Sequence, residues 1–462
     1  MIYISTRGNA PELTFKQALL VGLAEDGGLY VPQIWPKFTT QEIGYFRGEP
    51  YTHVAFEVMR RFVDGEIPDA ALKTMIDEAY ATFHHPAVTP LVQIGANEWQ
   101  LELFRGPTMA FKDVAMQILA RLMDYVLQEN GETLTIVGAT SGDTGGAALA
   151  AFSGRENIEI FFMFPEGRVS PVQQRQMTTL RGKNTHAIAI NGSFDDCQNM
   201  VKSMFANHTF RDKVKLSAVN SINWGRIMAQ TVYYFTAAVS LGAPDHDVSF
   251  TVPTGNFGDV YAGYVAKQMG LPIKRLVIAT NENDILYRAL SSGRYEMQGV
   301  KQTITPSMDI QISSNFERLL FDASGRDVEA VRAMMGNLRQ SGAYDLPNNV
   351  LTYIRSGFDV GTATEAETIK LTKSVHTKSG YLLDPHTAVA LHVAQKHSTD
   401  EVPMITLSTA HPAKFPATVQ MATGVHPTLP AWTGNLMDDK EEFAVLENNQ
   451  AAVETYITSL LG

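Results

Sequence analysis

Cysteine is almost absent from this chain of 462 residues, which contains only Cys197. A single cysteine excludes an intramolecular disulfide and a zinc site built from several thiolates. Cys197 follows Ser193-Phe194-Asp195-Asp196, a pattern typical of a helix start, and we expect it to be a small buried apolar residue rather than a nucleophile. The adjacent pair His84-His85 precedes Pro86 and indicates a turn, because neighbouring side chains point to opposite sides of most backbones. We therefore expect no metal site.

Positive charge and long apolar runs are also scarce. The 37 Lys and Arg residues are outnumbered by 48 Asp and Glu residues, which gives a net charge of −11. This balance argues against a nucleic-acid or anionic-membrane surface, although a small anionic substrate needs only a few local donors. No apolar run approaches the roughly 18 residues of a membrane span, and residues 1–8 lack the basic and apolar regions of a signal peptide. We expect a cytoplasmic protein that acts on a small molecule.

The first 95 residues are predicted to form a mainly helical unit with a short strand-like entry. Helical spacing occurs at Phe15, Ala18, Leu19 and Leu23, and two more helical stretches cover residues 52–62 and 69–83. From residue 96 to residue 425 strands and helices alternate. The final segment, residues 426–462, is acidic and polar at first and is predicted to end in a helical tail.

The region 96–425 contains short apolar runs separated by helical patterns. Continuous apolar strands that alternate with helices are typical of parallel sheets with both faces covered. The sequence therefore predicts an α/β fold. The strand candidates are residues 133–137, 158–164, 185–190, 248–252, 275–279 and 404–407.

One lysine lies where a helix should begin. Gly106-Pro107 indicates a turn, and the apolar residues from Val114 onward recur every four positions, so Lys112 falls in the first turn of a helix. The helix dipole disfavours a cation there and favours the neutral amine that a Schiff-base lysine needs. Taken alone, Lys112 is better explained as a solvated lysine at a helix start.

Two glycine-rich loops follow predicted strands. Thr140-Ser141-Gly142-Asp143-Thr144-Gly145 and Thr254-Gly255-Asn256-Phe257-Gly258-Asp259 each lie between a strand and a helix, where α/β sheets bind ligands. Hydroxyls and backbone N–H groups suit a carboxylate or phosphate. Asp259 would repel a phosphate unless its carboxylate turns away to cap the helix. For each loop alone, a bare tight turn is the preferred interpretation.

A third loop, Ser408-Thr409-Ala410-His411-Pro412-Ala413-Lys414, follows the last strand candidate. A hydroxyl in this loop is suited to a ring nitrogen, and Lys414 is suited to an anion. For His411 alone we prefer a structural role.

Together these features resemble the pyridoxal-phosphate enzymes of the tryptophan-synthase β-like group (fold type II), and within it the threonine synthase family. The resemblance implies two doubly wound, mostly parallel sheets with helices on both faces, beside the N-terminal helical unit. It extends over nearly the whole chain in order. The stretches that carry it are residues 3–8, 26–32, 106–113, 140–145, 220–226, 255–259 and 409–415.

The resemblance also implies roles for individual residues. Lys112 would form the aldimine with pyridoxal 5'-phosphate and move protons between substrate carbons, and Thr409, with Ser408 as competitor, would contact the pyridine nitrogen. Thr140, Ser141 and Thr144 would grip the substrate carboxylate, and Asp143 would face the ring oxygen where most relatives of the fold carry asparagine. The cofactor phosphate would be held by Gly255, Asn256, Phe257, Gly258 and Asp259. The expected cations for the leaving phosphate are Arg226, then Lys414, then Arg105.

The implied reaction converts O-phospho-L-homoserine and water to L-threonine and phosphate, by β,γ-elimination and then β-hydration. Two alternatives remain open from the sequence: a related phospholyase or serine/threonine dehydratase, and a non-catalytic binder of a phosphorylated metabolite. His386 is left without a role. A monomer or weak homo-oligomer is the association state that the resemblance implies.

Overall fold

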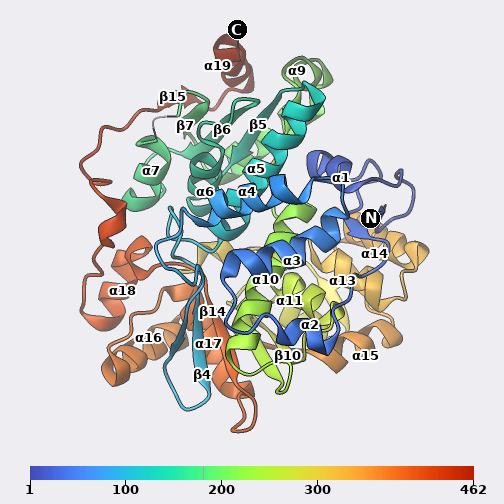
Figure 1. The fold of residues 1–462 in the computed structure, drawn as a ribbon. Coiled ribbons are helices and arrows are strands. Elements are labelled where there is room, and N and C mark those ends of the chain that lie inside the picture. Colours follow the sequence, from blue (N-terminus) through green and yellow to red (C-terminus); the bar gives the residue numbers. More distant parts are fainter. Residues whose placement is uncertain (181, 462) are drawn as a thin grey trace. The chain divides into compact units, whose positions relative to one another are not determined.

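The computed structural model describes residues 1–180 and 182–461, and it divides into two compact units (Figure 1). Unit 1 contains Met1–Ile76, His85–Arg105 and Ser221–Pro427, and unit 2 contains Asp77–His84, Gly106–Asn220 and Thr428–Gly462. The chain therefore crosses from one unit to the other several times. The domain boundaries that we placed near residues 95 and 425 stay predictions.

Unit 1 is built on a six-stranded sheet in the order β13-β10-β9-β14-β4-β3. All neighbouring strands are parallel except the edge pair β3 and β4. Strand β14 pairs in parallel with β9, so the loops that follow these two strands leave the same edge of the sheet. The strands of unit 1 are β1 (Tyr3–Ser5), β2 (Tyr30–Pro32), β3 (Leu91–Gln93), β4 (Glu98–Glu102), β9 (Val248–Pro253), β10 (Ile273–Thr280), β11 (Arg294–Glu296), β12 (Ala343–Asp345), β13 (Phe358–Thr362) and β14 (Met404–Ser408).

Helices bury the sheet of unit 1, and α10 is the most deeply embedded of them, with fifteen of its seventeen residues buried. Helix α17 packs on β9, β10, β13 and β14. The helices of unit 1 are α1 (Phe15–Val21), α2 (Thr40–Gly44), α3 (Tyr51–Val63), α10 (Trp224–Ser240), α11 (Gly258–Gln268), α12 (Ile285–Ser292), η1 (Pro306–Met308), α13 (Phe316–Ala323), α14 (Val328–Ser341), α15 (Asn348–Gly357), α16 (Glu365–Ser379), α17 (Pro385–His397), η2 (Pro412–Lys414) and α18 (Pro416–Thr423); α4 (Asp69–Tyr80) runs on from unit 1 into unit 2.

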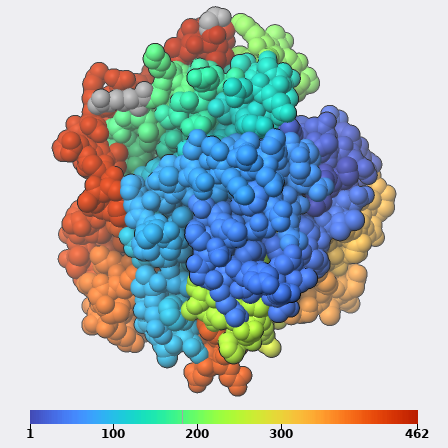
Figure 2. All heavy atoms as spheres, viewed as in Figure 1, coloured from blue at the N-terminus to red at the C-terminus, as the bar shows by residue number. Residues whose placement is uncertain are grey.

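The N-terminal segment of unit 1 is anchored by aromatic contacts. The rings of Tyr3 and Phe62 lie 5.8 and 5.5 Å from that of Trp224, the first residue of α10. Figure 2 shows parts of this segment, in dark to medium blue, on the face that the view presents. The helices predicted for residues 1–95 are confirmed by α1, α3 and α4, and the strand-like entry by the antiparallel pair β1 and β2.

Unit 2 is built on a five-stranded, fully parallel sheet in the order β15-β7-β6-β5-β8. In β6, Phe161 and Met163 pack against α8, α9 and α19, while Ile160 and Phe162 are buried on the opposite face. The strands are β5 (Leu134–Ala139), β6 (Ile158–Pro165), β7 (Thr185–Asn191), β8 (Leu216–Ser217) and β15 (Ala444–Glu447), and the helices are α5 (Lys112–Asn130), α6 (Asp143–Phe152), α7 (Pro171–Thr178), α8 (Phe194–Ala206), α9 (His208–Val214), η3 (Ala431–Thr433) and α19 (Gln450–Leu461).

Two mostly parallel sheets confirm the predicted α/β fold, and all six strand candidates are strands. The prediction for residues 426–462 was incomplete, because the polar stretch before the helical tail contains β15. Cys197 is buried in the core of unit 2 as expected, and burial raises the pKa of its thiol to about 11. Over residues 1–180 and 182–461, no helix combines the length and apolar character that crossing a membrane requires.

Candidate active site

Lys112 is the first residue of α5, as predicted, and only 8% of it is exposed. Its Nζ lies 3.9 Å from the Asp143 Oδ2 of α6 and 4.8 Å from the centre of the Phe111 ring. The other carboxylate oxygen of Asp143 accepts a hydrogen bond of 2.7 Å from Gln173 Nε2. Unit 2 thus brings together two of the predicted residues, an amine and a carboxylate, in a buried ion pair.

The loop before Lys112 is fixed by contacts that the sequence analysis missed. The buried carboxylate of Asp113 accepts hydrogen bonds from the backbone N–H of Thr108 (2.8 Å) and from its hydroxyl (2.6 Å). Gln176 Nε2 donates to the Thr108 carbonyl at 2.9 Å. Met109, which follows Thr108 in the chain, has a positive φ of 59°, a conformation that costs a non-glycine residue about 1 kcal/mol or more. These bonds hold a strained turn that sets where Lys112 begins its helix.

The loop between β5 and α6 exposes polar groups at the start of a helix. Thr140 Oγ1 accepts from the N–H groups of Gly142 and Gly145, both at 3.0 Å. Within the described part of the chain, the N–H and hydroxyl groups of Ser141 and Thr144 have no hydrogen-bond partner. An unpaired row of donors at a helix N-terminus suits a carboxylate, which supports the predicted substrate contact.

In unit 1, carbonyl groups of the loop between β9 and α11 accept hydrogen bonds from a neighbouring segment. Ser313 Oγ donates to the Gly255 carbonyl at 2.6 Å, and Asn315 donates to the Asn256 carbonyl through Nδ2 at 2.9 Å and through its backbone N–H at 3.1 Å. A Cβ atom on Gly255 would lie 2.6 Å from the Ser307 carbonyl oxygen, so only glycine fits there. The segment around η1 therefore shapes this loop from behind.

The N–H groups of the same loop are free. Those of Gly255, Asn256, Phe257 and Gly258 donate to no acceptor among the residues that the structure describes. They lie at the N-terminus of α11, where the helix dipole adds to the attraction for an anion. We refer to these four residues as the anion cup.

Asp259 does not cap α11, in contrast to the arrangement suggested by the sequence. Its Oδ1 accepts hydrogen bonds from the hydroxyls of Tyr233 and Tyr234 on α10, the second at 3.2 Å, and α11 has no side-chain cap. The two tyrosines are preferred because they are buried and need an acceptor. The Asp259 carboxylate thus accepts from α10, and it does not cap α11.

The loop after β14 presents two neighbouring hydroxyls with different surroundings. Ser408 Oγ lies 3.3 Å from Thr387 Oγ1. The hydroxyl of Thr409, a residue that is 6% exposed, has no partner within residues 1–180 and 182–461. Of the two, Thr409 has the hydroxyl available to a ligand.

Arg226 lies in the first turn of α10 and is 4% exposed. Burial lowers the pKa of its guanidinium to about 10, so it stays cationic at neutral pH. Its Nε has no hydrogen-bond partner in the described part of the chain, and no ion pair involves it there. A buried cation without an acceptor is costly, and an anionic ligand would satisfy it.

The other predicted cations have different surroundings. Arg105 Nε donates to Glu102 at 2.8 Å, so its charge is largely satisfied within the protein. Lys414 is fully buried in η2. His411 caps η2 by accepting the Ala413 N–H at 3.2 Å, and burial beside Arg105 lowers the pKa of its imidazole to about 4. A neutral capping role agrees with our preference for a structural His411.

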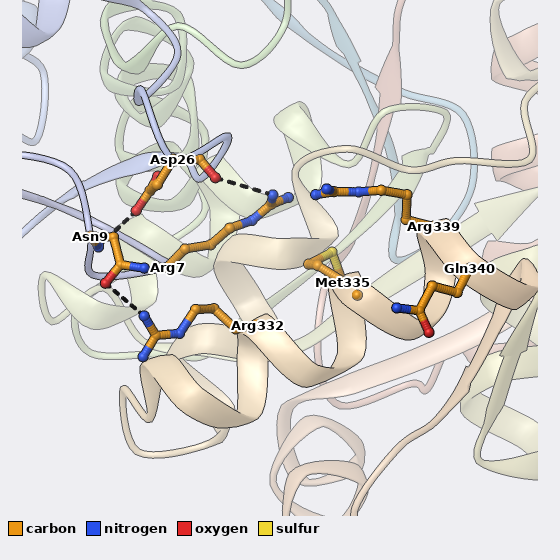
Figure 3. A pocket seen from close by; sticks show the side chains of 8 residues that line it. Arg7, Asn9, Asp26, Arg332, Met335, Arg339 and Gln340 are labelled. Atoms are coloured by element: carbon orange, nitrogen blue, oxygen red, sulfur yellow. Dashed lines mark hydrogen bonds between the residues drawn. The ribbon is translucent and has the colours of Figure 1, made fainter.

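No group of three or more metal-ligating side chains occurs in the portions of the chain described above. A cavity of about 270 Å³ is found in unit 1 between α14 and the N-terminal segment, and Arg7, Asp26, Arg332 and Arg339 line it (Figure 3). Arg7 is paired with Glu317 and Arg332 with Glu329. None of the predicted site residues lines this cavity.

Comparison with known proteins covers nearly the whole chain. Family models match in order: the threonine synthase N terminus at residues 2–80, the pyridoxal-phosphate dependent enzymes at residues 83–336 and the threonine synthase C-terminal region at residues 387–457. A threonine synthase from Pseudomonas aeruginosa is 51% identical over 460 residues, which cover 99% of this chain and 98% of that protein.

Solved structures of threonine synthases also match this chain. A pyridoxal-phosphate-bound threonine synthase from Brucella melitensis is 61% identical with a TM-score of 0.98, covering 100% of this chain and 99% of its own. Yeast threonine synthase is 39% identical with a TM-score of 0.95, covering 100% and 98%.

Proposed function

The chain belongs to the threonine synthase family of pyridoxal-phosphate-dependent lyases, and from this premise we propose how its own residues convert O-phospho-L-homoserine and water to L-threonine and phosphate. The observation that carries the proposal is the anion cup, whose four N–H groups donate to no acceptor among the described residues and suit the oxygens of a phosphate monoester.

Each of the predicted residues suits one chemical group of pyridoxal phosphate. The anion cup would hold its phosphate, the free hydroxyl of Thr409 would donate to or accept from its ring nitrogen, and the Lys112 amine would attach to its aldehyde. When bound, this cofactor draws electrons from the substrate α-carbon, and a hydroxyl on its ring nitrogen keeps that withdrawal moderate. Asp143 remains a proposed cofactor contact, and its carboxylate lies against Lys112 and Gln173.

Lys112 is the proposed proton carrier. The reaction removes a proton from the α-carbon and one from the β-carbon, releases the γ-phosphate, adds a proton at the γ-carbon and the hydroxyl of water at the β-carbon, and returns a proton to the α-carbon. A single buried amine would be able to take up the protons from the α- and β-carbons and to give protons back at the γ- and α-carbons. Asp143 Oδ2, 3.9 Å from Nζ, would stabilise the protonated amine, and the bond from Gln173 would keep that carboxylate in place.

The substrate would be held at its two charged ends. Thr140, Ser141 and Thr144 would bind the α-carboxylate through hydroxyl and N–H donors at the start of α6. Arg226 would bind the leaving phosphate, with Lys414 as a second cation. A guanidinium is well suited to phosphate because it offers two parallel donors.

Replacing Arg226 with methionine should raise the KM for O-phosphohomoserine about tenfold or more, since a hydrogen bond to a charged group contributes about 1.5–3 kcal/mol. Its free energy of unfolding, measured in urea, should be unchanged or higher, because a buried charge without a partner is removed. Arg318→Met is the matched control: Arg318 is also buried but donates to the carbonyls of Tyr30 and Ile222. The control should lose about 3 kcal/mol of stability. An unchanged KM in Arg226→Met would reject the role of Arg226.

The proposed activity is tested by incubating the purified holoenzyme with O-phosphohomoserine and quantifying phosphate and amino acids. Threonine and phosphate should appear in equal amounts. Release of phosphate with 2-oxobutanoate and no threonine would indicate a phospholyase or dehydratase, and no release would indicate a binding protein.

The remaining expectations belong to the same proposal. The enzyme would act on its small phosphorylated substrate in the cytoplasm, as a monomer or weak homo-oligomer. The net charge of −11 supports the absence of a nucleic-acid partner.

A further inference from the structure

Asp384, the N-cap of α17, makes more bonds than a cap needs. Its Oδ1 accepts the backbone N–H of His386 at 2.9 Å and that of Thr387 at 3.4 Å, which is the ordinary capping arrangement. The carboxylate also bonds to both side chains: Oδ1 lies 3.1 Å from His386 Nδ1, and Oδ2 accepts from Thr387 Oγ1. Asp384 is 1% exposed, so all these bonds form away from water and are correspondingly strong.

The first side-chain contact leads to the anion cup. The backbone N–H of Ser307 donates to His386 Nε2 at 3.3 Å. Because an N–H group can only donate, Nε2 accepts, and the ring proton is on Nδ1, where it is donated to Asp384. The Ser307 carbonyl is the group that leaves no room for a Cβ on Gly255. His386 therefore holds the backbone against which the anion cup packs.

The second side-chain contact leads to the loop after β14. Thr387 Oγ1 gives its proton to Asp384, so its oxygen is free to accept the backbone N–H of Thr409 at 3.2 Å. This bond fixes the backbone of Thr409, and the Thr409 hydroxyl has no partner among the described residues. Because the anion cup and Thr409 follow the neighbouring parallel strands β9 and β14, one carboxylate reaches both loops.

We propose that Asp384 is a positioning residue that fixes, through His386 and Thr387, the two loops that hold the cofactor's phosphate and its ring nitrogen. This inference rests on the proposed function of those loops. A carboxylate is required because it only accepts hydrogen bonds, which sets the direction of both side-chain contacts. An asparagine would reverse one of them.

The test compares two ligands of the apoprotein, pyridoxal phosphate and pyridoxal, which lacks the phosphate. His386→Leu should raise the Kd for pyridoxal phosphate roughly tenfold, about the effect of one lost hydrogen bond to a charged network, and leave the Kd for pyridoxal unchanged. Thr387→Val should raise both Kd values by a similar factor, because it disturbs the contact that both ligands share. Asp384→Asn should combine the two effects. His386→Gln, whose amide oxygen is able to accept the Ser307 N–H, should recover part of the loss.

Asp322→Asn is the matched control, because Asp322 is a buried carboxylate of unit 1 that bonds to Arg326 and Tyr261 and to neither loop. It should leave both Kd values unchanged. Equal changes for both ligands in His386→Leu, or changes in Asp322→Asn as large as in Asp384→Asn, would overturn the inference. Failure of the wild-type protein to bind pyridoxal phosphate would instead overturn the proposed function. If His386→Leu does not fold, His386→Gln and Thr387→Val still decide between these outcomes.

Discussion

Replacing Lys112 with alanine should lower kcat at least about 10⁴-fold and abolish the visible absorbance band of the bound cofactor, because one change removes both the covalent attachment and the proton carrier. The side chain is buried at the start of α5 and paired with Asp143. Absorbance spectra and single-turnover rates of the purified variant measure the two effects separately.

Lys112→Arg is the control for charge. It keeps a cation beside Asp143 but has no amine that attaches to an aldehyde, so it should lose the band and the activity as well. Both variants should unfold at nearly the wild-type temperature. A Lys112→Ala variant that keeps the band and turns over substrate would show that another amine carries the chemistry.

Replacing Gly255 with alanine should weaken pyridoxal phosphate binding up to about 100-fold. The added Cβ would lie 2.6 Å from the carbonyl oxygen of Ser307, a backbone atom that cannot rotate away. Overpacking of this kind costs about 1–3 kcal/mol, and each 1.4 kcal/mol corresponds to about a tenfold change in affinity. Titration of the apoprotein with pyridoxal phosphate measures the effect.

Gly258→Ala is the control within the same anion cup. A Cβ on Gly258 has its nearest neighbours at 3.5–3.6 Å, which is ordinary van der Waals contact, and the backbone N–H is kept in both variants. Its affinity should stay within about threefold of wild type. Equal losses in the two variants would mean that packing against Ser307 does not shape the cup.

The strands that the sequence predicted include β6 and β9, which are buried on both faces and mainly apolar. The missed strands are short or polar. β15 alternates intermediate and exposed positions and forms only because β7 offers it an edge, and β13 contains an aspartate and a glycine. Their formation depends on a neighbouring strand rather than on local preference, so the sequence pattern carried no signal for them.

The features of the candidate site also fall into those that neighbouring residues predicted and those that depend on distant contacts. Lys112 and the glycine loops were predictable because a helix start or a strand–helix turn depends on residues that are neighbours in the sequence. Asp384 carried a local signal as well, an N-cap followed by Pro385, but its link through His386 to Ser307 spans 79 positions. Whether the hydroxyl of Thr409 or that of Ser408 is available to a ligand likewise depends on Thr387, a residue of helix α17. Contacts between distant segments decide which of several plausible donors is free.

The discontinuous make-up of unit 2 has a consequence for the nascent chain. Strand β7 exposes a bare edge until β15 pairs with it, and α8 and α9 lack the covering that α19 provides. All of residues 221–427, which belong to unit 1, are synthesised before that last segment emerges. The first part of unit 2 is thus synthesised early, and its sheet is completed only when β15 emerges. Until then the unpaired edge of β7 is a site at which the nascent chain is prone to aggregate.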